Sequence, residues 1–265
     1  MLADGYDCFL LDLDGTLYRG DRPVPGAADA VSRLHRARKR VIFMTNNSGR
    51  TPEEIAAKLA GYGIEADAKD VVTSALATAD LLARRKVGSA FVIGGKGIRT
   101  ALEDEGIELR DGEPSDVDCV IVGWDRTADY AKLKNAGLLV QRGAALIATN
   151  ADNAFPAPDG LWPGAGALLS VITTTTGASA EIVGKPHAPL FRRALAEAGG
   201  RKPLVVGDRL DTDIGGAAGL GWDSLLVFTG ISQPPDLDSS DVHPTYSASD
   251  LSAIFEEEKA VRRPW

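Results

Sequence analysis

Short apolar runs alternate with stretches of helical periodicity along most of this 265-residue chain. Residues 8–11 form an apolar run typical of a buried parallel strand, and in residues 27–39 apolar side chains recur at helical spacing. Further strands are predicted at 41–44, 71–73, 90–93, 119–122, 145–148, 204–206 and 225–228. Further helices are predicted from Thr51 to about 61–63 and at 76–85, 97–105, 130–141, 164–173, 190–198, 214–218 and 251–258. The pattern is that of an α/β protein.

The alternation restarts near residue 88 and resumes in a third section after Gly184. A chain of this length can form one large core or two modest ones. Hydropathy taken alone therefore predicts an α/β protein with a possible inserted domain.

Charge and composition narrow the classes of partner. The net charge of -8 argues against nucleic acid, which is held by clustered Lys and Arg. An acidic protein that binds an anionic substrate needs a local cation, which points to a metal.

Cys8 and Cys119 lie far apart beside apolar residues and are expected to be free thiols. The N-terminus lacks a signal-peptide pattern, and no run approaches the roughly 18 apolar residues of a membrane span. We expect a cytoplasmic protein without a membrane partner.

Reactive side chains gather where predicted strands end. They are Asp12 and Asp14 after the first strand, Thr45, Asn46 and Asn47 after the second, and Asp208 and Asp213 after a late one. Lys185 precedes Pro186 at the entrance to a helix. In open parallel sheets, ligands bind beyond the carboxyl ends of the strands. These loops are therefore the candidate site.

Four converging carboxylates repel one another, by roughly 4 kcal/mol per pair at about 4 Å and an effective dielectric of about 20. Such a cluster requires a cation, and ligation by oxygen alone suits Mg²⁺. Lys185, Thr45 and backbone N–H groups near Asn46 then supply donors for phosphate oxygens. This division of roles suits phosphoryl transfer, with one aspartate as nucleophile and another as general acid–base.

The segments FLLDLDGTLYRGDRPVPGA, MTNNS, VGKP and VVGDRLDTDI occur in this order. Together they resemble the haloacid dehalogenase-like phosphatase superfamily, and their spacing resembles its NagD-like branch, which includes p-nitrophenyl, glycerol-phosphate, phosphoglycolate and pyridoxal-phosphate phosphatases. The resemblance covers essentially the whole chain. It implies a Rossmann-like, doubly wound parallel-sheet core with an inserted α/β cap domain.

Matched by position, the resemblance implies a role for each motif residue. Asp12 is the nucleophile that forms a phosphoaspartate, and Asp14 is the acid–base whose main-chain carbonyl also binds Mg²⁺. Asp12 and Asp208 are further metal ligands, with Asp213 in the outer shell. The residues expected to hold the phosphoryl group are Thr45, Asn46, Asn47 and Lys185.

The same resemblance implies a catalytic core at 1–79 and 183–265 and a cap at 80–182 that selects the substrate. Residues 148–156 resemble the specificity loop of the family, with Asn150, Asp152 and Phe155 as candidate substrate contacts. Phe155 stands where some relatives have a His, which weakens a pyridoxal phosphate preference. Relatives commonly dimerise through the cap, so a homodimer is expected.

Some features have an alternative interpretation. The segment Gly94-Gly95-Lys96-Gly97 invites a phosphate-loop interpretation, but it lacks the G-x4-G-K-[ST] spacing and is better explained as a strand-to-helix turn. Asp125 and Arg126 either face the substrate or form an ion-paired loop.

The function predicted from the sequence is hydrolysis of a small phosphorylated metabolite, with glycerol 3-phosphate or phosphoglycolate favoured. Nucleoside monophosphate and pyridoxal phosphate are alternatives with the same mechanism. Rival functions are a phosphoprotein phosphatase and a regulator that binds metal and phospho-ligand without catalysis. Intact Asp12 and Asp14 argue against the regulator, because binding alone needs no acid–base.

Overall fold

The computed structural model describes residues 1–157, 159–256 and 259–262, and the chain divides into two compact units. The first unit contains residues 1–45, 53–72 and 185–265, and the second contains residues 46–52 and 73–184. These bounds place 46–52, 73–79 and 183–184 in the second unit, although the predicted core at 1–79 and 183–265 includes them. The assignment of one unit as catalytic core and the other as cap stays a prediction.

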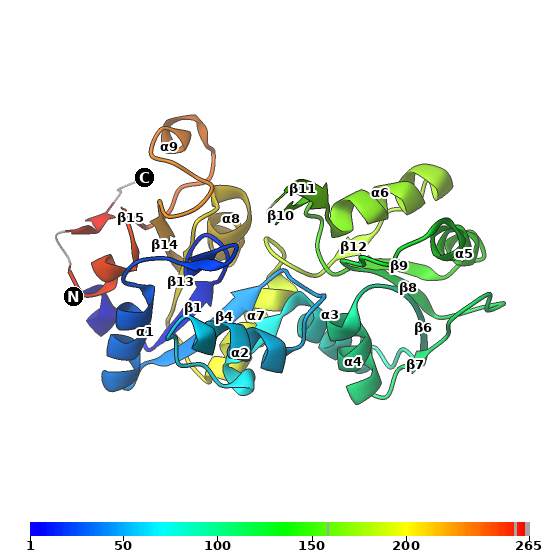
Figure 1. Cartoon of the computed structure of the whole chain (residues 1–265), viewed down its shortest axis with the longest axis horizontal. Helices are drawn as coiled ribbons and strands as arrows, with labels where there is room; N and C mark the ends of the chain where they lie inside the picture. The colour runs from blue at the N-terminus through cyan, green and yellow to red at the C-terminus, as the bar shows by residue number, and fades with distance from the viewer. Residues whose placement is uncertain (158, 257–258, 263–265) are drawn as a thin grey trace. The chain divides into compact units, whose positions relative to one another are not determined.

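The first unit is built on a seven-stranded sheet in the order β16-β15-β14-β13-β1-β4-β5 (Figure 1). Its strands are β1 (Cys8–Asp12), β4 (Arg40–Thr45), β5 (Val71–Thr73), β13 (Pro203–Gly207), β14 (Asp223–Val227), β15 (Tyr246–Ala248) and β16 (Val261–Arg262). The central strand β1 pairs in parallel with β13 and β4 and is buried along its whole length. That burial explains why its sequence is apolar throughout, since a central parallel strand is covered on both faces.

Helices cover both faces of this sheet. Phe9 and Leu11 share a buried cluster with side chains of α1, α2 and η4, whereas Leu226 belongs to a separate cluster with η3. The helical elements of this unit are α1 (Ala27–Arg36), α2 (Pro52–Gly61), α7 (Ala188–Ala198), α8 (Gly215–Gly219), α9 (Asp236–Ser239) and the short turns η1 (Leu2–Gly5), η2 (Ala68–Asp70), η3 (Leu210–Ile214) and η4 (Leu251–Ile254). The predicted doubly wound sheet is confirmed.

The second unit has its own five-stranded sheet in the order β12-β9-β8-β6-β7, parallel throughout. The strands are β6 (Ser89–Ile93), β7 (Glu108–Leu109), β8 (Cys119–Val122), β9 (Ala145–Ala148) and β12 (Glu181–Ile182). Its helices are α3 (Ser74–Arg84), α4 (Lys96–Asp104), α5 (Tyr130–Gln141) and α6 (Ala165–Thr176). Within this unit α3 and α4 lie on one face of the sheet, and α5 and α6 on the other (Figure 1).

Two predictions at helix ends were wrong. The expected helix at 251–258 is a single turn, η4, and residues 257–258 lie outside the described residues. The helix predicted at 164–173 continues to Thr176, because it ends only at Gly177, which adopts the left-handed conformation.

Sequence periodicity also missed two hairpins, β2 (Tyr18–Arg19) with β3 (Arg22–Pro23) and β10 (Ala154–Ala157) with β11 (Gly160–Pro163). These strands are too short, and too rich in Pro, to show a clear alternation. No helix in the described part of the chain is long and apolar enough to cross a membrane.

Candidate active site

Three strands of the first unit deliver polar side chains to the same edge of the sheet. Asp12 ends β1, Thr45 ends β4, and Asp208 directly follows β13. The parallel register pairs Asp12 with Met44 and Leu11 with Val206, so the three strands end level with one another. The side chains therefore gather beyond the carboxyl ends, where the sequence analysis expected them.

A buried cluster of charged groups occupies this edge. One carboxylate oxygen from each of Asp12, Asp208 and Asp213 lies within 4.8 Å of the other two. Lys185 Nζ donates to Asp12 Oδ1 and, at 2.7 Å, to Asp213 Oδ1. None of the four residues is more than 7% exposed. The structure therefore brings together four residues that lie up to about 200 positions apart in sequence.

Backbone N–H groups bind the carboxylates of Asp208 and Asp213, and two glycines leave room for them. Ile231 N–H donates to Asp208 Oδ2 at 2.7 Å, and Arg209 N–H donates to Asp213 Oδ2 at 3.2 Å. A Cβ atom on Gly230 would lie 1.9 Å from Asp208 Oδ2, and one on Gly207 would lie 2.2 Å from Asp213 Cγ. Side chains at these two glycines would collide with the carboxylates, so the cluster depends on both glycines.

Electrostatics within the cluster favour an additional cation. Burial raises the pKa of Asp208 to about 6, and the charge of Asp213 contributes to the rise. Burial also raises the pKa of Asp12 well above its ordinary value, although Lys185 opposes this. Burial disfavours the charged form of Lys185, but Asp12 and Asp213 outweigh it and raise the pKa of the lysine. One ammonium group thus faces three carboxylates.

The donor set fits a hard divalent cation. Among the described residues, Asp208 Oδ1 is buried and has no hydrogen-bond partner. An unsatisfied buried carboxylate oxygen is costly unless a ligand completes it. Because Asp12, Asp208 and Asp213 offer only oxygen atoms, the cluster could hold Mg²⁺ or Ca²⁺ rather than a softer metal.

Asp14 lies on the loop after β1 and is exposed, unlike Asp12. Partial desolvation raises the pKa of its carboxyl group, and the cation of Lys58 opposes the rise. Lys58 Nζ donates to Gly20 O at 2.9 Å and lies 3.9 Å from the centroid of the Tyr18 ring. Lys58 was not among the predicted site residues, because only the fold brings α2 to this loop.

Asn46, which follows Thr45, is hydrogen-bonded within the second unit. Its Nδ2 donates to Asp152 Oδ2 at 3.1 Å, and its carbonyl accepts from Ser74 Oγ at 2.7 Å and Asn150 Nδ2 at 2.8 Å. Asn47 Oδ1 accepts from Gly49 N–H at 2.9 Å, which closes a local turn. The structure thus joins Asn46, Asn150 and Asp152, three of the predicted site residues; the contact with Ser74 was not predicted.

Phe155, the last candidate of the specificity loop, stacks on Trp124 with ring centroids 4.4 Å apart. Trp124 was also missed, since a lone aromatic residue after a strand carries no sequence signal of its own. Asp125 accepts from Lys132 Nζ at 2.7 Å. The ion-paired interpretation of Asp125 is therefore the one that the structure bears out.

Comparison with known proteins places this geometry in a family. Residues 9–108 match the family model described as haloacid dehalogenase-like hydrolase, and residues 182–254 match a second model described as HAD-hydrolase-like. The acid sugar phosphatase of Staphylococcus epidermidis is 41% identical over 258 residues, which are 96% of this chain and 99% of that protein. The chain belongs to the haloacid dehalogenase-like hydrolase family.

Two solved structures support the same assignment. The glycerol phosphate phosphatase of Mycobacterium tuberculosis in complex with magnesium is 36% identical with a TM-score of 0.91, covering 96% of this chain and 77% of that one. The 4-nitrophenylphosphatase of Thermotoga maritima is 31% identical with a TM-score of 0.89, covering 97% and 98%. The predicted resemblance to the NagD-like branch, and the predicted class of enzyme, a phosphatase of this family, are both confirmed.

Proposed function

We propose that the protein hydrolyses a small-molecule phosphate monoester through a phosphoaspartate formed on Asp12. The observation that carries the proposal is the buried cluster of Asp12, Asp208, Asp213 and Lys185 at the carboxyl ends of β1 and β13. A carboxylate held at a fixed position beside an ammonium group can act as a nucleophile toward an anionic phosphate, because the cation offsets charge repulsion.

In the first half-reaction, an oxygen of Asp12 attacks phosphorus and the bond between phosphorus and the ester oxygen breaks. Asp14 donates its proton to that ester oxygen, so the substrate leaves as a neutral alcohol. The raised pKa of Asp14 favours the protonated form that this step requires. Lys185 and Thr45 hold the phosphoryl oxygens during the transfer.

In the second half-reaction, water attacks the phosphorus of the acyl phosphate and Asp14 takes its proton. The bond between Asp12 and phosphorus breaks, inorganic phosphate leaves, and both aspartates return to their starting states. General acid–base assistance of this kind contributes about 10²–10⁴-fold to a rate. Intact Asp12 and Asp14 favour this chemistry over a purely binding role.

Mg²⁺ is the metal that we propose for the cluster. Asp12 and Asp208 would hold it together with the main-chain carbonyl of Asp14, and Asp213 would lie outside them. When bound, the cation neutralises charge on the phosphoryl oxygens. The support is the oxygen donor set, the unpaired Asp208 Oδ1, and a related phosphatase solved with magnesium and with calcium.

A short aliphatic phosphate is the proposed substrate, with glycerol 3-phosphate first and phosphoglycolate second. The structural relative named glycerol phosphate phosphatase supports this choice. Sugar phosphates are a second candidate, favoured by the name of the 41% identical relatives, acid sugar phosphatase. Within the second unit, Asn150, Asp152 and Phe155 remain the proposed selectivity residues.

Phosphate release from a panel of esters tests the proposal. We expect turnover of glycerol 3-phosphate or a sugar phosphate with Mg²⁺, and none with EDTA or in Asp12→Asn. Phosphoglycolate, UMP, pyridoxal phosphate and a phosphopeptide complete the panel. Folded protein that binds Mg²⁺ but releases phosphate from no ester would contradict the proposal and favour a regulatory role.

The oligomeric state and location of the protein stay predictions. A homodimer through the second unit is consistent with large apolar side chains exposed there, Tyr130 at 84% and Leu161 at 75%. Sedimentation of wild type and Leu161→Ser would test the dimer. A cytoplasmic location awaits fractionation of cells that express the protein.

A further inference from the structure

The sheet of the second unit, like that of the first, has an edge where two neighbouring parallel strands, β6 and β8, end beside each other. β6 and β8 are adjacent, but the chain leaves them toward opposite faces. Ile98 of α4, which follows β6, lies on the face of Val92, whereas α5, which follows β8, packs with Phe91 and Val120. Ligands of open parallel sheets bind in the crevice at such a divergence.

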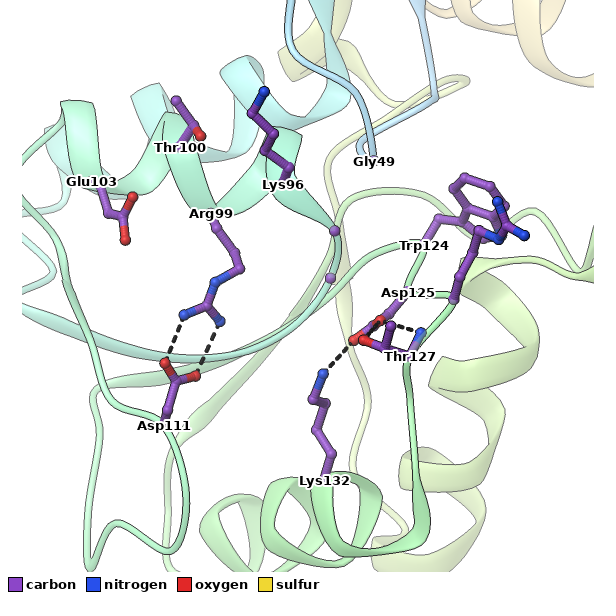
Figure 2. A pocket seen from close by; sticks show the side chains of 13 residues that line it. Gly49, Lys96, Arg99, Thr100, Glu103, Asp111, Trp124, Asp125, Thr127 and Lys132 are labelled. Carbon is purple, nitrogen blue, oxygen red and sulfur yellow. Dashed lines mark hydrogen bonds and ion pairs between the residues drawn. The ribbon is translucent and has the colours of Figure 1, made fainter.

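A pocket of about 660 Å³ lies at this point. Its size falls within the roughly 300–1,000 Å³ of small-molecule sites. The walls come from the turn after β6, α4, the segment after β7, the loop after β8 and the start of α5, together with Gly49, and all of them belong to the second unit (Figure 2). It includes part of the Gly94-Gly95-Lys96-Gly97 segment, which the proposed function does not use.

Two ion pairs line the pocket and hold its cations in fixed positions. Arg99 of α4 donates to both oxygens of Asp111, at 3.0 and 2.7 Å, and Lys132 of α5 donates to Asp125 at 2.7 Å. Figure 2 shows the two cations approaching from different helices. The Asp125 side chain is 2% exposed and also accepts two hydrogen bonds from Thr127.

Both cations keep donors for a ligand. Arg99 donates two of its roughly five N–H groups to Asp111, and Lys132 donates one of about three to Asp125. Among the described residues, neither side chain has another hydrogen-bond partner, although Glu103 and Asp125 also attract Arg99 electrostatically. The Asp111 side chain is 65% exposed. An exposed pair of this kind contributes little free energy, so a dianion that binds Arg99 bidentately can displace Asp111.

We propose that this pocket binds a phosphorylated small molecule, with its phosphate group between Arg99 and Lys132. The side chains carry the contact, because the N–H groups of Gly95 and Gly97 already donate to the carbonyls of Trp124 and Gly49. The N-terminus of α4 adds a favourable potential. The residues that line this pocket all belong to the second unit, whereas Asp12 and Lys185 belong to the first.

Calorimetric titration in EDTA tests the proposal without turnover. The probes are glucose 6-phosphate and inorganic phosphate, with glucose as the uncharged control. We expect glucose 6-phosphate to bind the wild type with one site and glucose not to bind. Arg99→Gln should weaken binding at least about tenfold, because charge-assisted hydrogen bonds are lost. Asp111→Asn should tighten glucose 6-phosphate binding about two- to fivefold, because the phosphate no longer has to displace a carboxylate from Arg99.

Arg85→Gln is the matched control, since Arg85 makes an equivalent bidentate pair with exposed Glu181 outside the pocket. It should bind like the wild type. Arg99 is a partly exposed side chain, so we expect Arg99→Gln to unfold at the wild-type midpoint. Absence of binding by the wild type overturns the proposal. So does binding that survives Arg99→Gln and disappears in Lys185→Gln, because the anion would then lie at the carboxylate cluster.

Discussion

The two sheets of this protein place charged side chains at the same structural position and balance them differently. In the first unit, Asp12, Asp208 and Asp213 surround the cation of Lys185, and one oxygen of Asp208 has no hydrogen-bond partner in the described part of the chain. In the second unit, Asp111 and Asp125 each have a cation of their own. The first arrangement favours an additional cation, and the second leaves N–H donors for the anion that we propose.

The comparison shows that the ends of parallel strands bring side chains together but do not determine which kind of ligand those side chains bind. The balance between burial and the partners of each carboxylate decides whether its pKa rises or falls. The carboxylates of the first unit are buried together, so repulsion and desolvation raise the pKa values of Asp12 and Asp208. Burial acts on Asp125 in the same direction, but hydrogen bonds from Lys132 and Thr127 outweigh it and lower the pKa.

The largest expected effect comes from replacing the proposed nucleophile. Asp12→Asn should lower phosphate release by at least about 10³-fold, because the amide cannot form the acyl phosphate. The same change at exposed Asp29, on α1 and away from the cluster, should leave turnover within about twofold of wild type. Initial rates with saturating Mg²⁺ measure both. If Asp12→Asn kept substantial activity, Asp12 would not be the nucleophile, and the carboxylate cluster of the first sheet would have no proposed catalytic role.

Removing the lysine from each edge tests whether a metal can replace it. Lys132→Gln leaves the buried carboxylate of Asp125 without its cation, and should lower the free energy of unfolding by about 2–4 kcal/mol with or without Mg²⁺. Lys185→Gln should be destabilised in EDTA and largely restored by Mg²⁺. Urea unfolding measures both.

Lys134→Gln, which breaks an exposed pair with Glu113, is the control for the lysine variants and should not change stability measurably. If Mg²⁺ stabilised the Lys132 and Lys185 variants equally, the cation would not be specific to the first unit.

A methyl group placed against Asp208 tests the geometry of the cluster. Gly230→Ala should lower Mg²⁺-dependent activity by about 10–100-fold and destabilise the protein by about 1–3 kcal/mol, because its Cβ would meet Asp208 Oδ2. Gly61→Ala is the control and should behave like the wild type, because an added Cβ there would meet no described atom within 4 Å beyond its chain neighbours and its own helix. Metal titration and activity assays compare Gly230→Ala with Gly61→Ala. If Gly230→Ala kept its activity, Asp208 could move without any loss of Mg²⁺-dependent turnover.

The smallest expected effect is the pH dependence of stability in EDTA. Because burial raises the pKa of Asp208 to about 6, this carboxyl group binds more proton in the folded protein than in the unfolded chain between about pH 4 and 6. Asp208 therefore contributes on the order of 2 kcal/mol to the free energy of unfolding below that window, and this contribution is lost as pH rises through it. Asp125, with a lowered pKa, contributes in the opposite direction, below its ordinary pKa.

Urea unfolding on either side of this pH window measures the effect. Asp208→Asn should show a shallower fall in stability than the wild type, and Asp29→Asn should show the same fall. Mg²⁺ should stabilise the wild type more above the window than below it, because protons compete with the metal for the carboxylates. If the stability of Asp208→Asn in EDTA fell as steeply across this window as that of the wild type, the desolvation argument would be contradicted.

Much of this outcome follows from local sequence. β1, β8 and α5 were predicted within a residue or without error, because apolar runs and helical spacing report burial directly. The gathering of Asp12, Thr45 and Asp208 followed from one rule about parallel strands. The short hairpins and the last helix were not predictable in this way, because tertiary contacts and single turn residues decide them.

The sequence by itself determined the α/β alternation, the carboxylates at strand ends and the family of the chain, because each is carried by neighbouring residues. Only the tertiary structure decided that Lys185 bridges Asp12 and Asp213, that Gly230 makes room for Asp208, and that Arg99 and Lys132 share a pocket. These facts depend on segments far apart in the chain. Their distances are fixed by packing, which no local pattern of residues encodes.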